Sequence, residues 1–265
     1  MEIVCPCWHP DAETIESGLP ILDSQGVTAI EIGFIMQPKY FDLRDLDSVN
    51  RLVQSLDMST IRVHAVHAGF GSSLDFSSFD DQVHEHGVEA QIEAMEVAKL
   101  LGAGVVVIHA SDGGINTDRQ RRLDRARGVI RELAKVAEQS GLTLAIENLP
   151  PGYLGCEAEE IAWLIEQSRS EWVAACFDSG HANLTGNFLR QAEMLLPMAA
   201  TTHLHDNDGL TDQHKFPGEG TINWAEFGRL YNEFGRVVPL VLECIPPDGI
   251  AWSDAFQKFR IKIGC

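Results

Sequence analysis

The sequence predicts a single domain of the α/β class, a (β/α)8 or TIM barrel that extends over residues 1–265. Short β-prone runs alternate with helical patterns eight times along the chain, which matches this fold in both number and length. Several of these runs are almost continuously apolar, as in parallel strands that are covered on both faces. Neither a Pro/Gly/Ser-rich linker nor a break in composition marks a second domain. An open doubly wound sheet is the alternative, but the residues after the first predicted strand, CWHPDAET, lack a glycine-rich phosphate turn.

The predicted strands are short and β-prone, and the predicted helices show apolar residues at helical spacing. The strands are expected at 3–7, 28–34, 61–67, 105–109, 143–147, 173–178, 201–205 and 239–243. The helices are expected at 14–25, 47–56, 83–101, 119–140, 157–167, 188–196, 224–234 and 252–263. Gly26, Gly102 and Gly141 each follow a predicted helix, as is typical of helix C-termini. The order is therefore strand then helix throughout.

Composition disfavours several classes of protein. With 45% hydrophobic residues the chain can bury one large core, yet no apolar run approaches the roughly 20 residues that cross a membrane. The formal net charge is −19, from 39 acidic and 20 basic residues, and this disfavours unaided binding to nucleic-acid phosphates. No secretory leader is visible at the N-terminus, and six cysteines are too few for a disulfide scaffold. We therefore expect a cytoplasmic protein with reduced thiols and no membrane partner.

Residues 203–220, HLHDNDGLTDQHKFPGEG, concentrate imidazoles and carboxylates where a predicted strand passes into a loop. Asp212 and His214 are two residues apart, so an extended backbone would direct both side chains to the same side. Imidazole nitrogen and carboxylate oxygen together suit zinc, manganese, cobalt or iron better than magnesium or calcium. The stretch therefore predicts a transition-metal site, provided that other strands end in the same way.

Six successive predicted strands, the third to the eighth, do end on or near such a group. The residues are His67, His109, Glu147, Asp178 with His181, His203 with Asp212 and His214, and Glu243. Active residues of a barrel come from the C-terminal ends of its strands. A single histidine at a strand end is more often a hydrogen-bonded structural residue. Six neighbouring strands that all end this way predict a metal site at the rim of the barrel.

Five segments resemble the xylose-isomerase-like barrel superfamily, which includes sugar and sugar-phosphate isomerases and epimerases as well as the endonuclease IV repair enzymes. They are AIENLP around Glu147, CFDSGHAN around Asp178 and His181, HLHDND from His203, DQHKFPGEG from Asp212, and LVLE ending at Glu243. The resemblance covers the third to the eighth strand. Its most specific parts are the patterns F-D-S-G-H and D-x-H-x-x-x-G-E-G.

This resemblance implies one of two metal centres. Similarity to the epimerases implies one manganese-like ion held by Glu147, Asp178, His203 and Glu243. Similarity to endonuclease IV implies three zinc ions, held by these four residues together with His67, His109, His181, Asp212 and His214. The expected cofactor is thus a divalent metal, zinc or manganese, in one to three ions.

Charge favours more than one ion. Glu147, Asp178, Asp212 and Glu243 would bring four negative charges to one rim, which is costly without cations, whereas histidine ligands would be neutral. One divalent ion leaves the set at −2. Three ions give +6 against −4, an excess that suits a bound hydroxide or phosphate group.

The isomerase or epimerase interpretation assigns a role to both glutamates. The ion would bind two adjacent oxygens of a ketose or aldose and stabilise an enediolate. Glu147 and Glu243, facing each other across the barrel mouth, would remove and return a proton on opposite faces of the substrate carbon. Trp8, His9, Glu31 and Phe34, at the ends of the first two strands, would line the substrate side. The epimerases often carry an arginine shortly after the seventh-strand histidine, where this chain has DQH at 212–214, so their substrate contacts do not transfer.

A multi-metal phosphoesterase acting on a phosphate ester is the alternative. A DNA-repair enzyme would also need a basic groove, but the loops after the second and third strands contain aromatic residues and few bases. The basic cluster Arg119, Arg121, Arg122, Arg125 and Arg127 is better explained as a solvated helical face. A non-catalytic carbohydrate-binding barrel is the third possibility. We expect an isomerase or epimerase of a small sugar or sugar phosphate; the residues favour no particular substrate, metal or oligomeric state.

Overall fold

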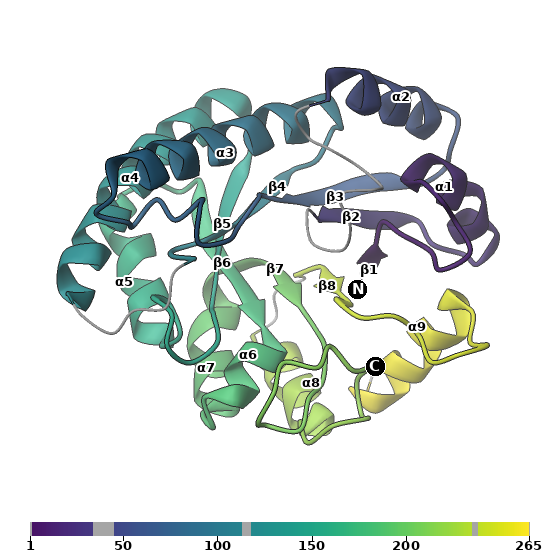
Figure 1. Cartoon of the computed structure of the whole chain (residues 1–265). Coiled ribbons are helices and arrows are strands. Elements are labelled where there is room, and N and C mark those ends of the chain that lie inside the picture. Colours follow the sequence, from purple (N-terminus) through teal and green to yellow (C-terminus); the bar gives the residue numbers. More distant parts are fainter. Residues whose placement is uncertain (1, 34–44, 113–117, 235–237, 265) are drawn as a thin grey trace.

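The computed structural model describes residues 2–33, 45–112, 118–234 and 238–264. Its strands form one closed parallel barrel in chain order, in which β8 pairs with β1. The strands are β1 (Ile3–Pro6), β2 (Ala29–Gly33), β3 (Arg62–His67), β4 (Val105–His109), β5 (Thr143–Glu147), β6 (Val173–Asp178), β7 (Ala199–His203) and β8 (Leu240–Val241). Figure 1 shows the helices arranged around the outside of these strands. The predicted single-domain TIM barrel is therefore confirmed.

The helices follow the strands along the chain. They are α1 (Ile15–Ser24), α2 (Leu46–Asp57), α3 (Asp81–Leu100), α4 (Arg119–Ser140), α5 (Ala158–Ser168), α6 (Ser179–Leu184), α7 (Phe188–Leu195), the 3-10 helix η1 (Leu196–Met198), α8 (Trp224–Glu233) and α9 (Trp252–Lys262). Local sequence sets several of their ends: the Asp80 side chain caps the start of α3, and Gly141 ends α4 with a φ of 68°. None of the helices in the described ranges combines the length and the apolar character that crossing a membrane requires.

Alternation along the strands decides which side chains enter the barrel. In β5, Leu144 and Ile146 belong to the large core between the sheet and the helices, whereas Ala145 belongs to a smaller cluster that also contains Val107 of β4. Glu147 follows Ala145 by two residues and His109 follows Val107 by two residues. Because side chains alternate across a strand, Glu147 and His109 continue the inner series and reach the mouth of the barrel.

Three elements differ from their predicted bounds in ways that affect the site. β8 is shorter than 239–243, so Glu243 follows the strand, although its backbone N–H still donates to Leu204 O at 3.1 Å. β7 ends at His203, so His205 lies beyond it. The structure also contains a short helix, α6, that the sequence pattern does not predict. The Asp178 side chain caps its first turn. Phe34, a predicted substrate contact, lies outside the described residues.

The cysteines in the described part of the chain are free and buried, in line with the expected reduced thiols. Burial raises the pKa of Cys7 to about 11, so this thiol stays protonated near neutral pH.

Candidate metal centre

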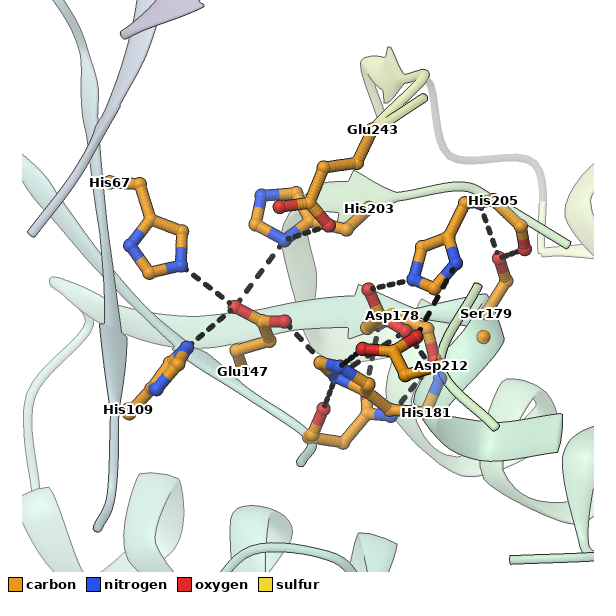
Figure 2. A network of polar contacts seen from close by, with 12 residues as sticks. His67, His109, Glu147, Asp178, Ser179, His181, His203, His205, Asp212 and Glu243 are labelled. Carbon is orange, nitrogen blue, oxygen red and sulfur yellow. Dashed lines mark hydrogen bonds and ion pairs between the residues drawn. The ribbon is translucent and has the colours of Figure 1, made fainter. Parts of the chain in front are cut away.

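Glu147, the last residue of β5, lies in the middle of the barrel mouth, and its carboxylate is surrounded by four imidazoles (Figure 2). Its side chain is only 2% exposed. Glu147 Oε2 lies 3.1 Å from His67 Nε2, 3.4 Å from His109 Nε2 and 3.3 Å from His203 Nδ1. Glu147 Oε1 lies 3.2 Å from His181 Nδ1. The ends of β3, β4 and β7 and the first turn of α6 thus meet at this one carboxylate.

Glu147, Asp178, His203 and Glu243 form a group whose candidate ligand atoms all lie within 4.8 Å of one another. Glu243 Oε2 lies 3.5 Å from His203 Nδ1. The His203 side chain is fully buried, and its Nε2 pairs with Glu31 Oε1 at 2.9 Å. On the other side of the ring, Nδ1 forms no hydrogen bond, and Glu243 Oε2 is also buried without one. Buried polar atoms are normally satisfied, and a cation among these nitrogen and oxygen donors would satisfy them. This donor set therefore fits a divalent metal.

Four histidines are anchored through one ring nitrogen and present the other to the mouth. The contacts are His67 Nδ1 to Ala68 O at 2.8 Å, His109 Nδ1 to Asp112 Oδ1 at 2.7 Å, His181 Nδ1 to Asn148 O at 2.9 Å, and His214 Nδ1 to Glu243 O at 2.9 Å. Since each partner is an acceptor, each Nδ1 carries a proton and donates it. This arrangement leaves Nε2 to face the site, as is usual for histidines that bind metals.

Asp212 brings a second group of side chains together. Its Oδ2 lies 3.3 Å from His181 Nε2 and 3.2 Å from His214 Nε2. The expectation of an extended backbone at 212–214 is wrong, because His214 adopts a φ of 46°. A left-handed turn at His214 brings its side chain to Asp212. The backbone carbonyl of Glu243 accepts a hydrogen bond from the His214 ring and fixes its position.

His205 belongs to the same region, although it is not among the ligands predicted from the sequence. It is fully buried, its Nε2 lies 3.1 Å from Asp178 Oδ2, and its ring stacks on His214. Together with Asp212 and His214, or with Asp178 and His181, it forms a group that could hold an ion. The signal for it was the His-x-His spacing at 203–205, which places both rings on one face of an extended chain.

Asp206 anchors the loop that carries Asp212 and His214. Its buried carboxylate accepts hydrogen bonds from the backbone N–H groups of Asn207, Gly218 and Ile222 and from Trp224 Nε1. A Cβ on Gly220 would lie 2.3 Å from Asp206 Oδ1, so this close approach requires glycine. The G-E-G segment of the sequence therefore shapes the loop around Asp206.

Burial and ion pairing set the charges of the metal-free site. Burial raises the pKa of Glu147, but His203, His109 and His181 outweigh it and bring the pKa well below its usual value. Burial lowers the pKa of His109, but Asp112 and Glu147 raise it to about 9. Burial also lowers the pKa of His214, but Asp212 and Glu243 raise it to about 9. Metal binding at neutral pH would therefore displace protons from these rings.

Two cavities open beside Glu243 and His214, which line both of them. The larger cavity, of about 510 Å³, contains Glu147 and the anchored histidines together with Phe70 and Tyr153. The smaller one, of about 380 Å³, is lined by residues that include Trp8 and Glu31. The predicted contact His9 lies apart from these linings: its ring contacts Gln25 Nε2 at 3.1 Å and accepts the Asp11 N–H at 3.2 Å.

The arginines at the start of α4 are engaged within the protein. Arg119 pairs with Glu160 at 2.6 Å and donates to Tyr153 O, while Arg122 pairs with Asp75 at 2.9 Å. Arg119 therefore holds the loop that follows β5, and Arg122 the loop that follows β3. The expectation of a simple solvated helical face does not apply to these two arginines.

Comparison with known proteins agrees with this geometry. A family model described as a xylose isomerase-like TIM barrel matches residues 20–259. A protein of Methanocaldococcus jannaschii is 30% identical over 197 residues, which are 71% of this chain and 66% of that protein. A D-psicose 3-epimerase of Enterocloster bolteae is 30% identical over 179 residues, 64% of this chain and 56% of that protein. A probable endonuclease 4 of Sulfurihydrogenibium sp. is 25% identical over 219 residues, 75% of this chain and 77% of that protein. The solved structure of a D-tagatose 3-epimerase-like protein matches with a TM-score of 0.84 and 26% identity, over 100% of this chain and 98% of that one.

Proposed function

The chain belongs to the family of xylose isomerase-like TIM barrels, and on this premise we propose that it is a metal-dependent isomerase or epimerase of a small, uncharged sugar. One observation carries the proposal: Glu147 and Glu243 both approach Nδ1 of His203, at 3.3 and 3.5 Å. Two carboxylates beside one proposed metal ligand can remove a proton from a metal-bound substrate and return it. Relatives that are named as sugar 3-epimerases support the same reaction class.

Glu147, Asp178, His203 and Glu243 would hold the first ion, and zinc and manganese both suit such nitrogen and oxygen ligands. When bound there, the ion would polarise a neighbouring carbonyl and make the proton on the adjacent carbon more acidic. His203 Nδ1 and Glu243 Oε2, which are buried and form no hydrogen bond, support this placement.

Glu147 and Glu243 would move the proton at that carbon. Glu147 comes from β5 and Glu243 from the chain after β8, and they approach His203 from different sides (Figure 2). A proton removed by one carboxylate and returned by the other on the opposite face inverts the carbon. Glu243 is 15% exposed and lines both cavities, whereas Glu147 lines only the larger one, so Glu243 has the freer access to a substrate.

The cavity linings favour an uncharged sugar over a sugar phosphate. Among the described residues that line the two cavities, none is lysine or arginine, and several are acidic. Without a metal, burial raises the pKa of Glu31, but the charge of His203 outweighs it and lowers the pKa. Its buried Oε2 forms no hydrogen bond and would accept one from a sugar hydroxyl. The nearby indole of Trp8 offers a flat surface to the apolar face of a sugar ring.

A multi-metal phosphoesterase is the second candidate, and the His67 and His109 pair favours it. Both rings direct Nε2 toward Glu147 Oε2 while their Nδ1 atoms are anchored, which suits a second ion beside the first. Neighbouring ions can clamp a phosphate group without any basic side chain. A duplex nucleic acid is disfavoured as the substrate, because the net charge is −19.

A substrate screen distinguishes the two candidates. The protein would be loaded with Mn²⁺, Co²⁺ or Zn²⁺ and incubated separately with neutral ketoses, ketose phosphates and simple phosphate esters. We expect conversion of a neutral ketose to its epimer or isomer, which should be lost in Glu243→Gln and on chelation and retained in Asp248→Asn, an exposed acid elsewhere on the surface. Hydrolysis of an ester without conversion of any sugar would support the phosphoesterase instead.

A further inference from the structure

His205 occupies the space in which a side chain at residue 180 would lie. An ideal Cβ on Gly180 would be 1.9 Å from His205 Cε1, 2.4 Å from Nδ1 and 2.6 Å from Nε2. Gly180 lies in the first turn of α6, and its φ is not positive, so the backbone itself does not require glycine. The glycine in this metal-ligand segment is therefore explained by the imidazole ring that packs on it.

The structure holds the His205 ring in one position. The Ser179 hydroxyl accepts the His205 backbone N–H at 3.0 Å and donates to the His205 carbonyl at 2.7 Å. The ring nitrogen Nε2 lies 3.1 Å from Asp178 Oδ2 and donates to this carboxylate, which has only acceptors. Asp178 Oδ1 accepts the His181 N–H at 2.6 Å. Both oxygens of the proposed ligand Asp178 thus have a fixed protein partner, which sets the orientation of the carboxylate.

His205 also contacts two predicted ligands of the neighbouring group, Asp212 and His214. Its ring stacks on His214 with the centroids 3.8 Å apart and the planes 3° from parallel. A metal lies close to the plane of the imidazole that binds it, so two parallel rings at this spacing are poorly placed to bind one ion together. His205 Nδ1 forms no hydrogen bond and lies 3.8 Å from Asp212 Oδ1. The stacking indicates that His205 acts on the ligands rather than as one of them.

We propose that His205 is a positioning residue of the metal centre, which orients Asp178 through its Nε2–H and supports His214 with its ring face. The inference rests on the proposed metal function and adds a residue that lies outside the predicted ligand set. Partners of metal ligands typically contribute about 10- to 100-fold to metal affinity, and an effect of this size is expected for His205.

Titration of metal-free protein with Mn²⁺ tests this role without any substrate. We expect His205→Ala to bind the ion about 10- to 100-fold more weakly than the unsubstituted protein. His205→Gln should restore most of the affinity, because its amide can donate from nearly the same place, and exposed His86→Ala should have no effect. Unchanged affinity in His205→Ala would overturn the proposal, and so would a His205→Gln as weak as His205→Ala, which would indicate direct ligation. Failure of the unsubstituted protein to bind any ion would overturn the metal centre, and the positioning role with it.

Thermal unfolding of the metal-free protein tests the contact itself. Gly180→Ala alone should lower the Tm, because its Cβ collides with the His205 ring. In a His205→Ala background the same change should leave the Tm unchanged or raise it, since alanine fills the vacated space and is the better helix former. A similar loss of Tm in both backgrounds would show that the ring is not the reason for the glycine.

Discussion

The carboxylate of Glu147 lies 3.3 Å from Nδ1 of His203, both side chains are buried, and this nitrogen forms no hydrogen bond. Proximity without a hydrogen bond is unusual for two buried polar groups. A cation that accepts electron pairs from both would remove the conflict. His203 Nε2 pairs with Glu31 on the other side of the ring, so the proposed centre depends on the Nδ1 side, where Glu147 and Glu243 approach without a hydrogen bond.

Glu243→Gln should weaken metal binding by more than about tenfold, because it removes the charge of a proposed ligand while preserving its shape. The barrel should stay folded, since the side chain lies at the rim and is 15% exposed. Metal content after dialysis, together with the thermal unfolding curve, measures both effects. The exposed Glu193→Gln is the matched control. A Glu243→Gln protein that retains its full metal content would remove Glu243 from the ligand set.

Metal affinity should rise with pH between about 6.5 and 9. His109 and His214 have pKa values raised from 6.5 to about 9 in the metal-free fold. Their ion pairs stabilise that fold fully below pH 6.5, and this contribution is lost as the pH rises through 9. Between pH 6.5 and about 9 the metal-free protein should therefore lose stability. Over the same range a metal ion has fewer protons to displace from the two histidines, so its affinity rises. Calorimetric titration in buffers of different ionisation enthalpy measures the proton release; an affinity that does not change over this range would contradict the assignment.

More than one ion should bind at saturation. The groups around His67, His109 and Glu147 and around His181, Asp212 and His214 lie beside the first proposed site. His109→Ala should reduce the number of bound ions by one and leave the tightest ion in place. Counting metal atoms per chain gives the answer. Saturation of the unsubstituted protein at a single ion, with no change in His109→Ala, would show that these histidines are not ligands.

Asp206→Ala should destabilise the protein by about 3 kcal/mol, because it leaves buried donors of the loop without their charged acceptor. These donors include Gly218 N and Trp224 Nε1, both at 2.8 Å from Asp206 Oδ2. Denaturant unfolding measures the loss, and Asp248→Ala, at an exposed position, should change the free energy of unfolding by less than about 0.5 kcal/mol. Equal stability of the two variants would contradict the anchoring role of Asp206.

The strand ends could be predicted because two simple periodicities act together. The alternation in TLAIE places Glu147 on the inner face two residues after Ala145, and the barrel brings such ends to one mouth. The match between predicted and observed positions is therefore good for His67, His109 and Glu147. Their assignment as ligands stays a prediction until a metal is measured.

The contacts that cross between loops could not be predicted in the same way. Residues 179–184 are too few to show a helical period, so α6 and its cap by Asp178 were invisible in the pattern. The left-handed turn at His214 depends on the Glu243 carbonyl, which is distant in sequence. The packing of the His205 ring against Gly180 could not be predicted either. A glycine in the sequence does not show which distant residue fills the space beside its Cα atom.

Solvent deuterium incorporation tests the central claim most directly. The metal-loaded protein would be incubated in deuterated water with the ketose that it converts, or with a panel of neutral ketoses. If Glu147 and Glu243 transfer the proton, deuterium should appear on the carbon beside the carbonyl, in both the recovered substrate and its epimer. The Glu243→Gln variant should incorporate no deuterium under the same conditions. Absence of deuterium from every ketose tested, together with hydrolysis of a phosphate ester by the same preparation, would contradict the account.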